Sequence, residues 1–124
     1  GCRSATRIVF PKYLTYLPGS GVSFCNYMVE FVFPENVKSI SNYFFYGCIS
    51  LKEIVIPDTV TTIDFRAFWD CTSLTRITIP ASVTKIDSTA FDGCKKDKLV
   101  WVVTPGSYAE TYAKKNYYHY VYAK

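Results

Sequence analysis

The sequence lacks several features that would point to common functions. No apolar run reaches the about 18 residues that a membrane-spanning helix needs, so we expect no membrane insertion. The net charge is only +4, without the dense basic patch typical of nucleic-acid-binding proteins. His119 is the only histidine, and neither a Gly-x-Ser-x-Gly turn nor a Gly-rich phosphate motif occurs. We therefore expect no enzyme, no catalytic residue, no cofactor and no nucleic-acid partner.

The composition is that of a folded domain. Hydrophobic residues make up 49% of the chain and charged residues 19%, which excludes a disordered segment. A chain of 124 residues corresponds to one small domain. Because it starts with Gly1 and Cys2 rather than Met, the lack of a signal peptide says nothing about where the protein is located.

The cysteines reveal an internal repeat. The five cysteines follow one another at a constant spacing of 23 residues: Cys2, Cys25, Cys48, Cys71 and Cys94. A repeat of this length predicts a solenoid, in which each repeat forms one coil and successive coils stack. A single coil cannot bury enough apolar surface to fold alone, so the stack is expected to be stable only as a unit.

Other positions keep the same period. Prolines and aliphatic or aromatic residues recur in columns, among them Pro11, Pro34, Pro57 and Pro80; Val37, Val60 and Val83; Ile40, Ile63 and Ile86; and Phe45, Phe68 and Phe91. After Cys94 we align the last copy with a two-residue insertion, which places Leu99 with Leu74 and Val102 with Ile77. Both Val102 and Thr104 are then expected to point inward.

The local pattern predicts the shape of one coil. Residues 53–56 alternate and read as a short strand with Ile54 and Ile56 inward. Pro57 ends this strand, because proline cannot donate to a ladder, and Asp58-Thr59 forms a turn. Residues 65–69 read as one short helical turn on the far side.

These motifs resemble a known family. The stretches Ile79-Pro80-Ala81-Ser82-Val83-Thr84-Lys85-Ile86 and Ala90-Phe91-Asp92-Gly93-Cys94 look like the BspA-like class of leucine-rich repeats, as do the copies from 33 to 48 and from 56 to 71. The resemblance covers about residues 8–122 and implies an α/β repeat fold. That fold is a right-handed solenoid with short parallel strands on the concave face and short helical turns on the far side. It also implies a secreted or cell-surface bacterial protein that binds other proteins or adheres to hosts.

The C-terminal segment departs from the repeat. Ser107-x-x-Glu110 is a capping box and predicts a helix from Tyr108 to about Lys115, with a final strand over 117–122. We expect residues 1–104 to form the solenoid of about four repeats, starting in the middle of one, and residues 105–124 to cap it. The N-terminal end has no comparable cap, so we expect the parent protein to continue upstream.

The cysteine column has three interpretations. Buried free thiols that pack as small hydrophobes are favoured for Cys25, Cys48, Cys71 and Cys94. Disulfide bonds between neighbouring coils remain a second interpretation, because in-register coils lie ~4.8 Å apart and this distance permits a disulfide. A metal site is disfavoured, because the chain has no closely paired ligands such as Cys-x-x-Cys.

The solvent side of the strands is the candidate ligand face. The alternation that points Ile54 inward points two columns outward, and their members are Glu30, Val32, Glu53, Val55, Arg76, Thr78, Trp101 and Val103. A charged and β-branched surface of this kind can bind a protein partner, with Trp101 as the expected anchor. The alternative is a solvated sheet surface whose charges neutralise one another.

A tyrosine cluster gives a further alternative. Tyr108, Tyr112, Tyr117, Tyr118, Tyr120 and Tyr122 crowd the last repeat. Capping of the solenoid is favoured over stacking on a glycan. We conclude from the sequence that the chain is a non-catalytic recognition or adhesion module, with a possible host protein or glycan as partner; a structural spacer is the alternative.

Overall fold

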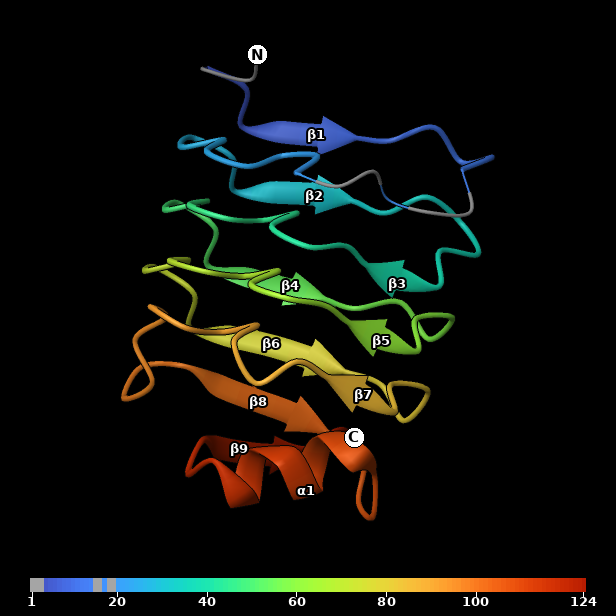
Figure 1. The fold of residues 1–124 in the computed structure, drawn as a ribbon, viewed down its shortest axis with the longest axis vertical. Helices are drawn as coiled ribbons and strands as arrows, with labels where there is room; N and C mark the ends of the chain where they lie inside the picture. Colours follow the sequence, from blue (N-terminus) through green and yellow to red (C-terminus); the bar gives the residue numbers. More distant parts are fainter. Residues whose placement is uncertain (1–3, 15–16, 18–19) are drawn as a thin grey trace.

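Each 23-residue repeat forms one coil of a right-handed solenoid in this computed structural model, which describes residues 4–14, 17 and 20–124 (Figure 1). The stack runs from strand β1 at one end to strand β9 and helix α1 at the other. This confirms the fold predicted from the cysteine spacing and the family resemblance.

One long face of the stack is made of parallel strands. They are β1 (Arg7–Val9), β2 (Glu30–Val32), β4 (Glu53–Val55), β6 (Arg76–Ile79), β8 (Val100–Val103) and β9 (His119–Tyr122). Strand β1 pairs with β2, and β4, β6, β8 and β9 form a second ladder in that order. Equivalent residues of successive repeats lie side by side, as in the pairing of Ile54 with Ile77.

The ladder is interrupted between β2 and β4, since no pairing joins these two strands although all their residues are described. At this boundary the inward column changes from Phe31 and Phe33 to the smaller Ile54 and Ile56. Phe44 also occupies the core position that Ala67 and Ala90 fill in later repeats. The larger phenylalanine side chains therefore lie next to the place where β2 and β4 do not pair.

A third ladder, made of two-residue strands, follows the proline turn of the coils. It consists of β3 (Ser39–Ile40), β5 (Thr62–Ile63) and β7 (Lys85–Ile86), which pair in parallel. Ile40, Ile63 and Ile86 point into the core from these strands.

The chain then crosses back through tight turns in place of the expected short helical turn. In the segment 64–70, the Ala67 N–H donates to the Asp64 carbonyl oxygen and the Trp69 N–H to the Arg66 carbonyl oxygen. Arg66 and Asp70 have positive φ values of 51° and 61°, which break a helical path. Gly47 and Gly93 hold the position equivalent to Asp70, with φ values of 71° and 82°.

The core is a column of phenylalanine rings between the strands and these return segments. Phe45, Phe68 and Phe91 stack face to face, with ring centroids 4.9 and 5.0 Å apart and interplanar angles of 7° and 3°. Phe45 and Phe68 are fully buried and Phe91 is 3% exposed. Each ring covers its neighbour in the next coil, which is how stacking supplies the burial that one coil lacks.

Helix α1 (Tyr108–Lys115) and strand β9 cover the last coil. The side chain of Ser107 accepts a hydrogen bond from the Glu110 N–H, as expected, while the Glu110 carboxylate accepts one from the Gly106 N–H. The helix buries Ala109 and Ala113 against the stack. Among the described residues, no helix has the length and hydropathy needed to cross a membrane.

Candidate functional site: the outer faces of the solenoid

The cysteine column forms a regular hydrogen-bond pattern in the core. The thiol of Cys48 donates to the Val22 carbonyl oxygen (3.2 Å), that of Cys71 to the Phe45 oxygen (3.1 Å) and that of Cys94 to the Phe68 oxygen (3.2 Å). The same three oxygens accept the backbone N–H of the preceding cysteine in the column. Each thiol therefore ties its coil to the coil before it.

The interpretation as buried free thiols is confirmed for Cys48 and Cys71, holds only in part for Cys94, which is free but half-buried, and is wrong for Cys25. Cys48, Cys71 and Cys94 are free, whereas Cys25 is disulfide-bonded. No cluster of three or more potential metal ligands occurs in the described part of the chain. Cys2 lies outside the described residues.

Burial gives these thiols a pH-dependent role in stability. Burial raises the pKa of Cys48 from 9.0 to about 12, and a hydrogen bond with Cys94 together with burial raises that of Cys71. The folded state thus keeps protons that the unfolded state releases above pH 9.0. The stabilisation is complete below that pH and is lost as pH rises through the folded pKa values.

We expect the free energy of unfolding to fall as pH is raised from about 8 to about 11, by up to about 1.4 kcal/mol per pH unit for each buried thiol. Urea unfolding at several pH values measures this slope. The control is Cys48→Ala combined with Cys71→Ala, which removes the thiols but keeps Tyr112 and Tyr118, whose pKa values burial also raises. An equal slope in the parent and this variant would contradict the role of the thiols.

The predicted ligand face is present over three coils. Glu30, Glu53, Val55 and Arg76 are exposed on the outward side of β2, β4 and β6. Val32 and Thr78 are half-buried in the same rows. Val55 is 66% exposed and Arg7 pairs with Glu30 at 3.2 Å across the β1–β2 ladder.

The last coil corrects the sequence alignment. Trp101 pairs with Ile77 and Val103 with Ile79, so the insertion shifts the strand by one residue rather than two relative to β6. A shift of one residue turns every side chain to the opposite face. Trp101 and Val103 are consequently fully buried and do not belong to the ligand face. Thr104, which was expected inward, is half-buried.

Other residues take the outward positions on the last two strands. Val100 and His119 continue the row of Arg76, and Val102 and Val121 continue the row of Thr78. His119 is exposed, whereas Val102 is only 6% exposed. The sequence offered only weak signals for these positions, because the strand register after Cys94 is set by a loop of irregular length.

Trp101 instead anchors the C-terminal cap. Its ring lies 4.9 Å from Phe91, 5.5 Å from Tyr112 and 4.8 Å from Tyr118, measured between centroids. The hydroxyl of Tyr112 donates to the Asp87 carbonyl oxygen, and the hydroxyl of Tyr108 accepts from the Ile86 N–H. Much of the tyrosine cluster therefore packs the cap onto the last coil, and Tyr117 stays 86% exposed.

A second surface was missed by the sequence analysis. Five rings from three return segments contact one another on the outside of the stack, and we name them the aromatic panel: Phe24, Tyr43, Tyr46, Phe65 and Trp69. Tyr46 stacks on Trp69 at 4.6 Å and 14°, and lies 4.5 Å from Phe24. The signal was the spacing of 23 between Tyr46 and Trp69, which the expected helical turn obscured.

A shallow hollow of about 400 Å³ lies where the chain leaves β2 and β4. Its walls come from two equivalent proline turns: Phe33, Pro34, Glu35 and Asn36 on one side, and Pro57, Asp58 and Thr59 on the other. It lies at the boundary where the strand ladder is interrupted. The two carboxylates are its charged groups.

The repeat, the parallel coils and the cap agree with the family comparison. The profile of the BspA type leucine rich repeat region matches residues 1–106 as six copies. The chain belongs to the BspA-type leucine-rich repeat family. No curated protein matches the chain.

Two solved structures are similar to this BspA-type chain. A leucine rich cell surface protein from Faecalibacterium prausnitzii A2-165 is 33% identical, with a TM-score of 0.76 over 86% of this chain. A leucine-rich repeat protein from Bacteroides ovatus ATCC 8483 is 32% identical, with a TM-score of 0.73 over 85% of this chain. The matched regions are 28% and 27% of those chains, so this chain spans less than a third of either.

Proposed function

We propose that this chain is a non-catalytic recognition module of a bacterial surface protein, and that it binds a protein ligand through the outward side of its strands. The observation that carries the proposal is the surface over β2, β4 and β6, where exposed charges flank an exposed Val55. A surface with an apolar centre and polar edges has the composition of a protein-binding surface. A host protein at the cell surface is the proposed partner.

The part of this surface over β4 and β6 is rigid because of how these two strands are held. Ile54 and Ile77 hold β4 and β6 onto the phenylalanine column, and the two strands pair in register. Glu53 and Arg76 then lie side by side on the outward side without forming an ion pair among the described residues. Two unpaired charges next to Val55 are available to groups on a partner.

Binding to a series of purified extracellular-matrix proteins tests the proposal. We expect at least one to bind the parent chain, and Val55→Lys to weaken that binding by about tenfold or more, because a charge then lies in the apolar centre. Ser88→Lys adds the same charge on the exposed far side and should leave the binding unchanged. Titration by surface plasmon resonance measures all three.

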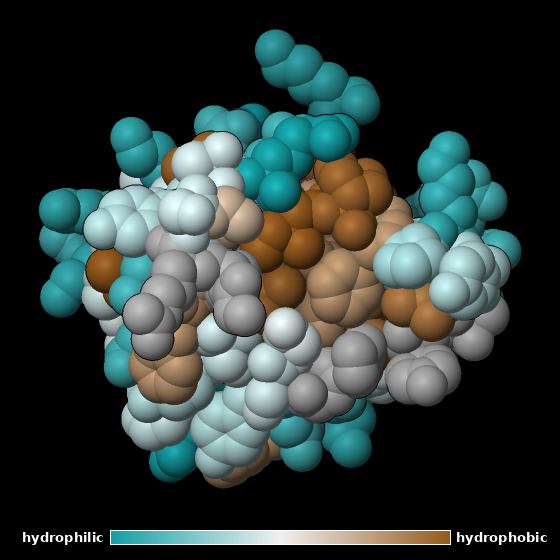
Figure 2. All heavy atoms as spheres, turned by 90° about the horizontal axis from the view of Figure 1, so that it is seen from above, coloured by the Kyte–Doolittle hydropathy of each residue, from teal (hydrophilic) through white to brown (hydrophobic). Residues whose placement is uncertain are grey.

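The competing function is a structural spacer within a longer surface protein. Viewed from the end that holds β1, hydrophobic atoms gather near the centre of the stack within a hydrophilic surround (Figure 2). Half-buried Ile8 and Phe10 pack against the core at this end. A spacer would bind none of the matrix proteins, so that result, or equal losses in Val55→Lys and Ser88→Lys, would favour it over recognition.

A further inference from the structure

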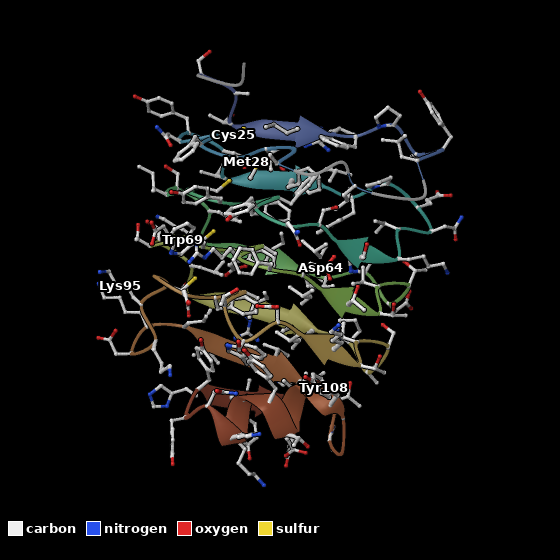
Figure 3. The ribbon with its side chains drawn as sticks, viewed as in Figure 1. Cys25, Met28, Asp64, Trp69, Lys95 and Tyr108 are labelled. Carbon is white, nitrogen blue, oxygen red and sulfur yellow. The ribbon has the colours of Figure 1, made fainter. Side chains whose placement is uncertain are left out.

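The aromatic panel is partly exposed, although its neighbours in the sequence, Phe45 and Phe68, are fully buried. Phe24 is 58% exposed and Phe65 36%, while Tyr43, Tyr46 and Trp69 are half-buried. Tyr43 contacts Tyr46, Phe65 and Trp69 at centroid distances of 5.8, 5.5 and 6.3 Å. Trp69 and Asp64 lie at opposite ends of one return segment (Figure 3). Tyr and Trp gathered on a surface are the residues that most often dominate protein interfaces.

The rings of this panel already contact a cationic group of the chain itself, the guanidinium group of Arg66. The guanidinium carbon of Arg66 lies 4.0 Å from the Trp69 ring centroid and 4.8 Å from that of Phe65. Arg66 forms no ion pair within the described residues, and its Nε atom is buried without a hydrogen-bond partner. Its positive charge is therefore stabilised by cation–π contacts with the ring faces, which attract cations through their quadrupole.

The charge around the panel is opposite in sign to that of the whole chain. The return segments that carry the panel, 20–24, 41–47 and 64–70, contain one basic residue, Arg66, and two acidic ones, Asp64 and Asp70. Their formal net charge is −1, on a chain whose net charge is +4. A local field of this sign attracts basic groups and repels acidic ones.

We propose that the aromatic panel is a second binding surface, which takes a basic segment of a partner protein by seating its Arg or Lys side chains on the rings. The two properties of the surface act together: the aspartates attract the basic segment, and the rings hold the cation after some of its water is removed. Arg66 competes for the same ring faces and carries the same sign as the partner's charge. This surface is separate from the strand face, so the two proposals can fail independently.

A fluorescein-labelled synthetic peptide of alternating Arg and Gly tests the proposal by fluorescence anisotropy, with the matched Glu and Gly peptide as its control. We expect the Arg peptide to bind, more weakly as salt is raised, and the Glu peptide not to bind. Because the chain as a whole is basic, non-specific attraction disfavours the Arg peptide.

Three variants make the test specific. Trp69→Ala should weaken binding of the Arg peptide by about tenfold or more, because it removes the central ring. Arg66→Gln should tighten it by about two- to fivefold, because it frees the faces of Trp69 and Phe65 and makes the segments more negative. Tyr117→Ala, which removes an exposed ring in the cap, should change nothing. Thermal unfolding by circular dichroism confirms that each variant is folded.

The response to Arg66→Gln shows whether the panel binds a cationic or an anionic ligand. Weaker binding of the Arg peptide in Arg66→Gln, or binding of the Glu peptide that Arg66→Gln abolishes, would overturn the proposal in favour of an anionic ligand. Failure of the parent chain to bind the Arg peptide, or unchanged binding in Trp69→Ala, would also overturn it. Val55→Lys should leave this binding intact, which keeps the result distinct from the test of the strand face.

Discussion

Replacing Phe68 with alanine is expected to lower the free energy of unfolding by about 3–5 kcal/mol, the range for removing a buried phenylalanine. The Phe68 ring is fully buried and stacks on Phe45 on one side and Phe91 on the other. Its removal leaves a cavity between two coils that depend on each other for burial. Urea unfolding followed by circular dichroism measures the change.

Phe65→Ala is the matched control, since it makes the same chemical change three residues earlier on the outside of the same coil. The Phe65 ring is 36% exposed, so we expect a loss of about 1 kcal/mol or less. Similar losses in both variants would mean that the phenylalanine column does not carry the stability of the stack.

Trp101→Ala is the second substitution with a large expected effect, again about 3–5 kcal/mol. The ring is fully buried between Phe91 of the last coil and Tyr112 and Tyr118 of the cap. Without it, α1 and β9 lose the group that joins them to the solenoid. We therefore expect a lower urea midpoint and loss of the near-ultraviolet circular dichroism of the cap tyrosines.

Trp69→Ala serves as its control, because Trp69 is the only other tryptophan and is half-buried on the panel. We expect it to cost clearly less stability than Trp101→Ala. If Trp101→Ala left the unfolding transition unchanged, the observed register of β8 would be contradicted, and the outward position expected from the sequence would be restored.

The sequence predicted the features that repeat. A constant spacing of 23 places Cys48, Cys71 and Cys94 in one column whatever the detailed path of the chain, and the same holds for the stacked phenylalanines. The capping of α1 was equally accessible, because Ser107 and Glu110 act within one turn of each other. Such local and periodic signals survive without knowledge of tertiary contacts.

The features that do not repeat were harder to predict. The loop after Cys94 is longer than in the other repeats. Only the pairing of Ile77 with Trp101 shows that the strand register shifts by one residue rather than two. The panel depends on the positive φ values of Tyr43 and Arg66, which turn the chain in a way that a helical turn does not. Neither position is a glycine, so no residue there signalled a left-handed conformation in advance.

The central claim is that the coils between β2 and the cap unfold as one unit, and native-state hydrogen exchange tests it most directly. The amides to follow are those of Phe45, Ile56 and Val100, which donate to Ala67, Thr78 and Thr75 across three coil boundaries. We predict that their opening free energies converge as urea is added, and that Phe68→Ala lowers all three by the same amount. A loss confined to Phe45, with the amide of Val100 unaffected, would contradict the cooperative stack.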